Sequence, residues 1–171
     1  MTVALEKPTV EWLLDGDASI RWQTKRDLLD APLDDVEQER QRVLTTGWGI
    51  DLLGLQDPEG TWDGGLYSPK WTSTTYTLLL LYRCGLPART PAALRAVELL
   101  WEGARFYDGG LTPARSIEAP EACVTSIYIT LARYFGYDDP RVDDALEWLL
   151  ANELADGGWN CRTVRFGDSH S

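Results

Sequence analysis

The sequence predicts an all-α fold made of stacked helical hairpins. Apolar residues recur at helical spacing through most of the chain, as in the row Cys123, Ile127, Leu131 and Phe135. An Asp-Gly-Gly loop occurs three times, with its Asp at positions 63, 108 and 156. The period is therefore 45 and then 48 residues, which is typical of an array of paired helices.

Composition limits the function classes that fit this chain. Its 171 residues, 44% of them hydrophobic, are enough for one globular domain with a core. The net charge of −11 argues against nucleic acid and against an anionic membrane surface, because both require clustered Lys and Arg. The longest apolar run, residues 78–82, is too short to span a bilayer, and no signal peptide is recognisable. Three widely spaced cysteines form no disulfide framework, so a cytoplasmic location is expected.

The first 46 residues predict short helices that diverge from the repeat. One helix covers residues 8–14, and Asp17 is a suitable cap for the next, which ends before Pro32. Acidic residues open a third, polar helix over residues 34–44, where they complement the positive N-terminal end of the helix. This segment is the N-terminal part of a single predicted domain, residues 1–171.

Residues 47–171 are expected to carry the repeats. Proline and glycine mark the helix boundaries, because proline suits a first turn and glycine suits a C-terminal cap. The β-prone residues 72–77 are assigned to a helix because of their place in the repeat. The predicted helices cover residues 48–56, 72–84, 92–103 and 120–135, and a further helix begins at Asp139-Pro140.

A longer loop motif occurs twice with the same spacing, as Gln56-x-x-x-Gly60-x-Trp62 and Glu153-x-x-x-Gly157-x-Trp159. The motif resembles the repeat of squalene and terpene cyclases and of protein prenyltransferase β subunits. The resemblance covers residues 48–171 and implies an α/α toroid, in which an inner ring of helices surrounds an apolar cavity. These six residues are expected to brace neighbouring hairpins through hydrogen bonds and indole stacking.

The resemblance implies an isoprenoid-handling protein whose partner is an isoprenoid or another apolar small molecule. The alternative is a non-catalytic helical-repeat module that binds a lipid or a protein. The acid motifs of cyclases are incomplete here, since Asp34-Asp35 and Asp143-Asp144 each lack the first Asp of Asp-x-Asp-Asp. Such pairs are also ordinary helix N-terminal acids. The catalytic residues and the enzymatic status of the chain are therefore left open.

Aromatic and basic residues near the inner-helix starts are the candidate ligand contacts. Aromatic faces accept an isoprenoid or stabilise a cation, although core packing is an alternative for each of them. The aromatic candidates are Trp71, Tyr76, Tyr128 and Trp159. Guanidinium groups bind a diphosphate through bidentate bonds, which makes Arg162 and Arg165 candidates, with simple surface charge as the alternative.

A zinc site is a further implication of the resemblance. Protein prenyltransferases bind zinc through an Asp-x-Cys at an inner-helix start and a His from a later repeat. Glu121-Ala122-Cys123 has this spacing with Glu in place of Asp, and Cys161 and His170 follow the next loop. Cys, His and carboxylate groups are suitable zinc ligands. The alternative is that Cys123 is a packed apolar residue and Cys161 a loop thiol.

The last loop has no partner helix after it, unlike the earlier loops. The chain is therefore expected to be truncated in mid-repeat after Ser171. A partial toroid of about three and a half hairpins would leave apolar helix flanks uncovered. Exposed patches of that kind usually find a partner, so a homo-oligomer is expected.

Overall fold

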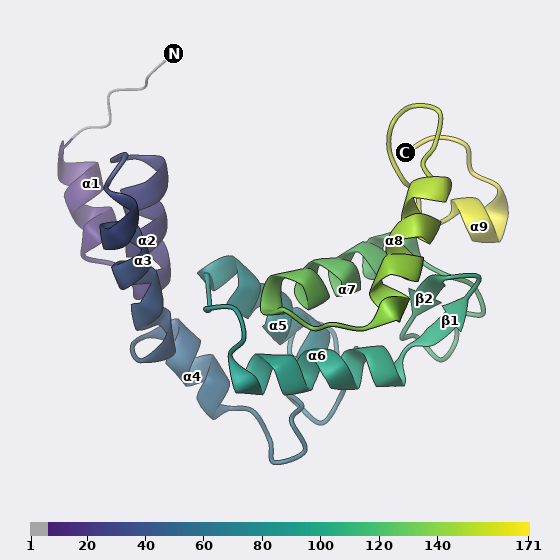
Figure 1. Cartoon of the computed structure of the whole chain (residues 1–171), viewed down its shortest axis with the longest axis horizontal. Helices are drawn as coiled ribbons and strands as arrows, with labels where there is room; N and C mark the ends of the chain where they lie inside the picture. Colours follow the sequence, from purple (N-terminus) through teal and green to yellow (C-terminus); the bar gives the residue numbers. More distant parts are fainter. Residues whose placement is uncertain (1–6) are drawn as a thin grey trace. The chain divides into compact units, whose positions relative to one another are not determined.

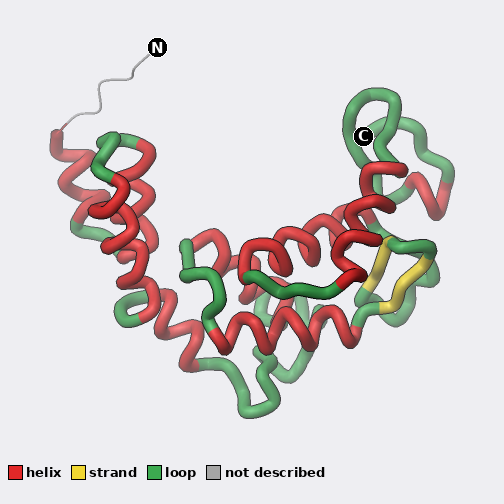
Figure 2. Tube along the Cα trace, viewed as in Figure 1, coloured by secondary structure: helices red, strands yellow, loops and turns green. Residues whose placement is uncertain are grey.

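The computed structural model describes residues 7–171, and most of them lie in α-helices (Figure 1, Figure 2). The helices are α1 (Lys7–Leu14), α2 (Ala18–Asp27), α3 (Leu33–Gln41), α4 (Trp48–Gly54), α5 (Thr74–Cys84), α6 (Pro91–Gly103), α7 (Ala122–Phe135), α8 (Pro140–Ala151) and α9 (Thr163–Phe166). A 3₁₀ turn, Arg42–Leu44, follows α3. The sheet in the described residues is a two-stranded antiparallel hairpin of β1 (Arg105–Tyr107) and β2 (Gly110–Thr112), so the predicted helical class is confirmed.

No helix among residues 7–171 has both the length and the apolar character needed to cross a membrane. Contacts divide the chain into two compact units. The first unit contains the chain up to residue 56 together with residues 80–87, and the second contains residues 57–79 and 88–171. The residues of α5 are therefore shared between the two units.

In the first unit, α2 packs against α1 and α3, and one aspartate sets the start of two helices. The carboxylate of Asp17 accepts hydrogen bonds from the backbone N–H of Ser19 at 2.8 Å and of Trp48 at 2.9 Å. It thus caps α2, as predicted, and also the start of α4. Gly47 has a φ of +68°, and a Cβ there would lie 1.8 Å from Asp17 Oδ2, so this junction requires glycine.

In the second unit, α7 packs against α6, α8 and β2, which lie around it in Figure 1. The largest fully buried side chains of this core are Trp101, Tyr128 and Phe135. The Trp101 ring lies 5.9 Å from that of Phe106 and 6.3 Å from that of Tyr128, measured between ring centroids. Aromatic packing therefore joins α6, β1 and α7 into one core.

Two of the Asp-Gly-Gly loops form the same kind of turn. Both central residues have positive φ, which gives the type I′ geometry that suits a two-residue hairpin. The residues and angles are Asp63 (51°) with Gly64 (62°), and Asp108 (50°) with Gly109 (99°). The flanking residues pair as Trp62 with Gly65 and as Tyr107 with Gly110. The second of these turns forms β1 and β2, which the sequence analysis did not predict.

The third Asp-Gly-Gly loop is of a different kind, which corrects the expected threefold recurrence. The N–H of Gly157 bonds the carbonyl of Leu154 at 2.9 Å, just as the N–H of Gly60 bonds the carbonyl of Asp57 at 2.9 Å. Both glycines have positive φ, 81° and 95°. The third loop therefore has the same turn as the segment around Gly60. This agrees with the longer motif, in which Gly60 and Gly157 hold the same place, and not with the 45- and 48-residue recurrence of Asp-Gly-Gly.

Threonines at the helix starts fasten the two hairpin turns. The hydroxyl of Thr75 donates to the carbonyl of Leu66 at 2.7 Å, and that of Thr125 donates to the carbonyl of Leu111 at 3.2 Å. Thr75 is the second residue of α5 and Thr125 is the fourth residue of α7, and each helix begins two residues later than predicted. The four predicted boundaries at residues 84, 103, 135 and 140 agree with the structure.

Candidate functional site

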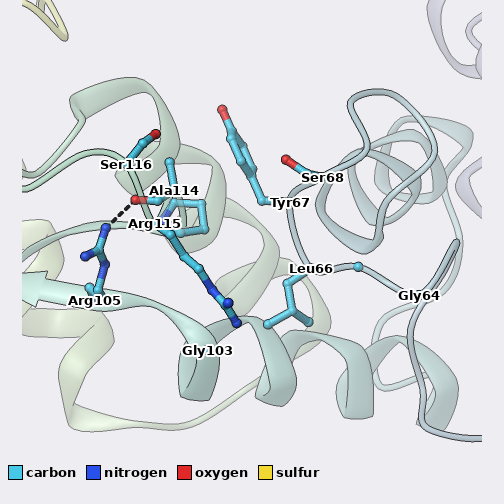
Figure 3. A pocket seen from close by; sticks show the side chains of 11 residues that line it. Gly64, Leu66, Tyr67, Ser68, Gly103, Arg105, Ala114, Arg115 and Ser116 are labelled. Atoms are coloured by element: carbon cyan, nitrogen blue, oxygen red, sulfur yellow. Dashed lines mark hydrogen bonds between the residues drawn. The ribbon is translucent and has the colours of Figure 1, made fainter.

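The second unit contains a cavity of about 940 Å³, here called the loop cavity (Figure 3). It is lined by residues 64–68, by Gly103 and Arg105, and by residues 113–116. This volume lies within the range of about 300–1,000 Å³ that is usual for small-molecule sites. The lining includes two arginines and no carboxylate, so the cavity is cationic although the whole chain is acidic.

The wall formed by residues 64–68 has a fixed backbone. The N–H and the hydroxyl of Thr75 both donate to the carbonyl of Leu66, at 2.9 Å and 2.7 Å. A Cβ at Gly65 would lie 1.8 Å from the carbonyl oxygen of Ser68, so the loop folds closely on itself there. Side chains of this wall are thus presented to the cavity from a backbone that has little freedom to move.

Arg105 on β1 fixes the opposite wall. Its Nη2 donates to the carbonyl of Ala114 and, at 2.7 Å, to that of Ile117. Its Nε is buried and has no hydrogen-bond partner among residues 7–171. A buried donor without a partner costs about 1–3 kcal/mol, a cost that Arg105 carries in holding this wall.

Arg115 is the second cation of the loop cavity. Its side chain is exposed and makes no hydrogen bond or ion pair within the described residues. Figure 3 shows its guanidinium group extending along the cavity toward Gly103 and Leu66. The charge of Arg115 is therefore available to a bound anion, whereas part of the hydrogen-bonding capacity of Arg105 is used to hold the wall.

An aromatic group adjoins the cavity through Tyr67. The ring centroid of Tyr67 lies 5.6 Å from that of Tyr76, which in turn lies 5.2 Å from that of Trp71. Burial raises the pKa of the Tyr67 hydroxyl well above its usual value, and a hydrogen bond with Tyr76 and the negative charge of Glu121 raise it further. Trp71 is exposed and has a φ of +77°, an unusual conformation for a bulky residue. Two predicted ligand residues, Trp71 and Tyr76, thus lie beside the cavity.

The other two predicted aromatic contacts lie elsewhere. Tyr128 is fully buried in the core, where its hydroxyl lies 3.4 Å from that of Thr75. Trp159 is 40% exposed, and its indole N–H donates to the carbonyl of Leu149 at 2.7 Å. Neither residue lines the loop cavity, so the structure brings together two of the four predicted aromatic residues.

The predicted diphosphate arginines lie in the final segment. Arg162 pairs with Asp168 at 2.6 Å. The guanidinium carbons of Arg162 and Arg165 lie 4.7 Å and 5.1 Å from the centre of the Phe166 ring. Both arginines are exposed, and neither lines the loop cavity. The cations that do line it are Arg105 and Arg115.

The motif residues take part in the framework. Trp62 is buried, and its backbone N–H donates to the hydroxyl of Thr74 at 3.1 Å. Arg95 of α6 donates to the carbonyl of Glu59 and packs over Gly60, where a Cβ would lie 2.6 Å from its Nε. In the second copy Glu153 and Gly157 are exposed, and Gln56 of the first copy is partly buried.

The four predicted zinc ligands are only partly assembled. The backbone N–H of Cys123 donates to the Sγ of Cys161 at 3.2 Å. Glu121 instead accepts a hydrogen bond from the hydroxyl of Thr112 at 2.8 Å, and His170 is exposed with its Nδ1 4.0 Å from a carboxylate oxygen of Asp156. Within residues 7–171 no three His, Cys, Asp or Glu side chains form a group that could hold a metal ion. The arrangement therefore brings together two of the four predicted ligands, Cys123 and Cys161, and the zinc site stays a prediction.

The thiol of Cys123 has an altered ionisation. Although Cys123 is an exposed residue, partial desolvation of its thiol raises the pKa to about 12, and a hydrogen bond with the Cys161 thiol and the negative charges of Cys161 and Glu121 contribute in the same direction. A position at a helix N-terminus normally lowers the pKa of a cysteine thiol. At neutral pH the thiol of Cys123 is therefore protonated and a poor nucleophile.

The first unit has a smaller hollow of about 250 Å³. It is lined by Trp48, Asp51, Leu52, Leu55, Leu80 and Cys84. Asp51 is the one charged residue of this lining, so the hollow offers few of the convergent polar groups that orient a small ligand. The loop cavity is accordingly the stronger candidate site.

Comparison of this chain with protein-family models, with curated proteins and with solved structures gives no match.

Sequence reasoning missed three residues of that site: Tyr67, Arg105 and Arg115. The available signal was the pair of arginines on either side of the second Asp-Gly-Gly loop, in an acidic chain. Their shared cavity depends on the Asp108-Gly109 turn and on the register in which Arg105 pairs with Thr112. Neither feature follows from helical periodicity.

Proposed function

We propose that this chain is an isoprenoid-handling protein, similar to the terpene cyclase and protein prenyltransferase superfamily, whose ligand binds in the loop cavity. The observation that carries the proposal is the pair of arginines, Arg105 and Arg115, in a cavity of ligand size whose lining contains no carboxylate. The aromatic group that begins at Tyr67 supplies a neighbouring apolar surface. The motif resemblance described above supplies the ligand class.

The cavity suits a ligand with an apolar part and an anionic part. Leu66, Tyr67 and Pro113 offer the apolar contacts. Arg115 has no hydrogen-bond or ion-pair partner within residues 7–171, so pairing it with a phosphate or carboxylate breaks no bond seen there. Arg105 adds a second positive charge to the lining. An isoprenoid diphosphate has both of these parts.

We also propose that the helices form a partial α/α toroid. Support comes from the succession of packed pairs, α6 with α7 and α7 with α8. It also comes from the matching turns at Gly60 and Gly157 and from the matching threonine bonds of Thr75 and Thr125. In this arrangement α5 and α7 are inner helices, and the loop cavity lies beside their N-terminal ends.

A non-catalytic binding module is the second candidate function. The observation that favours it is the lining of the loop cavity, which contains no Asp, Glu or His to act as a general acid or base. Zinc stays a prediction of the family resemblance, and no part of either candidate function depends on it.

Calorimetric titration with farnesyl diphosphate tests the proposal, with inorganic diphosphate and farnesol as partial ligands. Arg115→Gln should weaken binding about tenfold or more, because it removes one charge-assisted contact. Arg83→Gln is the matched control, since Arg83 is an exposed arginine of the first unit and its replacement changes the net charge equally. Equal effects of the two substitutions, or no binding of farnesyl diphosphate, would overturn the proposal.

The same samples separate an enzyme from a binding module. Wild-type protein is incubated with farnesyl diphosphate, and both released diphosphate and organic products are measured. Release above that of a sample with the Arg115→Gln protein supports turnover at the loop cavity. Tight binding without release supports the binding module, because ligand recognition is then present and the chemistry is not.

A further inference from the structure

Two cysteines that are far apart in the sequence meet at the start of α7. Cys123 is the second residue of α7, and Cys161 lies just before α9. The N–H of Cys123 donates to the Sγ of Cys161 at 3.2 Å. Because this sulfur already lies against the backbone of Cys123, rotation of the Cys123 side chain can bring its own sulfur toward it.

The two ends of this contact differ in how firmly they are held. The neighbours of Cys123, which are Ala122, Val124 and Thr125, are buried in the second unit. Residues 160–171 bond mostly among themselves or to Asp156. In the described part of the chain, the bond from Cys123 is the one hydrogen bond that joins residues 160–171 to α7. The contact between Cys123 and Cys161 is therefore where the final segment is attached to α7.

We propose that Cys123 and Cys161 are a site of reversible oxidation, at which an intramolecular disulfide ties residues 160–171 to the start of α7. The oxidant is a low-molecular-mass disulfide such as oxidised glutathione. This inference is independent of the proposed ligand, because it rests on the contact between the two sulfurs and not on the loop cavity.

The chemistry proceeds by two thiol–disulfide exchanges. The Cys161 thiol loses its proton, attacks one glutathione sulfur and releases the other glutathione as a thiol. The Cys123 thiol then loses its proton and attacks the Sγ of Cys161, which releases the second glutathione thiol. The protein loses two protons and two electrons, and the glutathione disulfide gains them as two thiols. No other reactant is required.

Closure of the disulfide follows from the contact between the two residues. Because the Sγ of Cys161 lies against the backbone of Cys123, the second exchange is intramolecular, and proximity favours it over reaction with another glutathione molecule.

The test uses the full chain, reduced and freed of metal, then incubated with oxidised glutathione at pH 8. After free thiols are blocked with iodoacetamide, the intact mass and tryptic peptides are analysed. The expected product is a monomer that has lost two hydrogen atoms, with the peptides of Cys123 and Cys161 linked. Cys84 is the internal control, because it is buried in the first unit and should keep its free thiol.

Two variants complete the test. Cys161→Ser should give no linked peptides. Cys123→Ser should stop at a glutathione adduct on Cys161. Trypsin should release the segment after Arg162 and Arg165 several-fold more slowly from the oxidised wild type, and reduction with dithiothreitol should restore the rate. Free thiols at both Cys123 and Cys161 after incubation, a disulfide between chains, or adducts alone in the wild type would overturn the proposal.

Discussion

Gly103, the last residue of α6, lies against the side chain of Leu66, so a Cβ at position 103 would come within 2.2 Å of Leu66 Cδ1. The backbone of Leu66 is held at its carbonyl by both polar groups of Thr75. An added methyl group must therefore be accommodated by the Leu66 side chain, which lines the loop cavity. This contact connects the packing of α6 to the shape of the candidate site.

Gly103→Ala should reduce the free energy of unfolding by about 1 kcal/mol, the lower end of the cost of overpacking, because the clash is with the end of a flexible side chain. It should also weaken the binding of farnesyl diphosphate several-fold by moving Leu66 within the cavity. Urea denaturation and calorimetry measure the two effects. Gly54→Ala is the control: Gly54 ends α4 and has no atom near its Cβ position, so stability should be unchanged or slightly higher. Equal behaviour of the two variants would contradict the argument.

The parts of the fold that follow from local chemistry could be predicted from the sequence. The apolar rows and the cap residues predicted the starts of α5 to α8 to within about two residues. This was possible because the burial of one helix face and the capping of the first N–H groups depend on residues close together in the sequence. The two-residue turn at Asp108-Gly109 was recognised as a loop but not as a hairpin, since β1 and β2 are only three residues long. Such short strands leave no alternation to detect.

The candidate site was less predictable because it depends on packing. Arg105 and Arg115 face one cavity only once the hairpin register is set, and Tyr67 reaches it from a loop that follows an Asp-Gly turn. Of the four predicted zinc ligands, Cys123 and Cys161 lie in contact. The carboxylate of Glu121 instead accepts a hydrogen bond from the hydroxyl of Thr112.

Asp139 should be a pH-dependent contributor to stability. It caps α8 by accepting the N–H of Arg141 at 2.8 Å, and the Arg141 guanidinium and the Tyr137 hydroxyl also donate to it. The hydrogen bonds from the Arg141 side chain hold the pKa of Asp139 well below its usual value. A lowered pKa stabilises the folded state at pH values above the unfolded pKa of about 3.9, and this contribution is lost as the pH falls toward the folded value.

Asp139→Ala should therefore lower the free energy of unfolding by about 1–2 kcal/mol at pH 7, mainly through the lost cap. The difference from wild type should shrink as the pH falls below about 4. Urea denaturation at several pH values measures this. Asp138→Ala is the matched control, because Asp138 is the exposed neighbour and makes no hydrogen bond or ion pair in the described residues. If the difference in unfolding free energy between Asp139→Ala and Asp138→Ala does not change with pH, ionisation of Asp139 is not involved.

Tyr67 should make the second unit sensitive to alkali. Its pKa is raised by burial, then by the hydrogen bond with Tyr76 and by the nearby negative charges of Glu121 and Cys123. In the unfolded chain a tyrosine ionises near pH 10. The folded state keeps the proton at higher pH, so its stability is unaffected below about pH 10 and falls as the pH rises from there toward the folded pKa.

Tyr67→Phe should consequently reduce the slope with which unfolding free energy falls above about pH 10, because the variant has no phenol to ionise at this position. Urea denaturation between pH 9 and pH 11 measures the slope, and absorbance of phenolate near 295 nm follows ionisation directly. Tyr107→Phe is the control for loss of a hydroxyl, since Tyr107 lies on β1 and outside the lining of the loop cavity. If the slope of unfolding free energy against pH falls equally in both variants, or is unchanged in Tyr67→Phe, the phenol of Tyr67 does not control the alkaline transition.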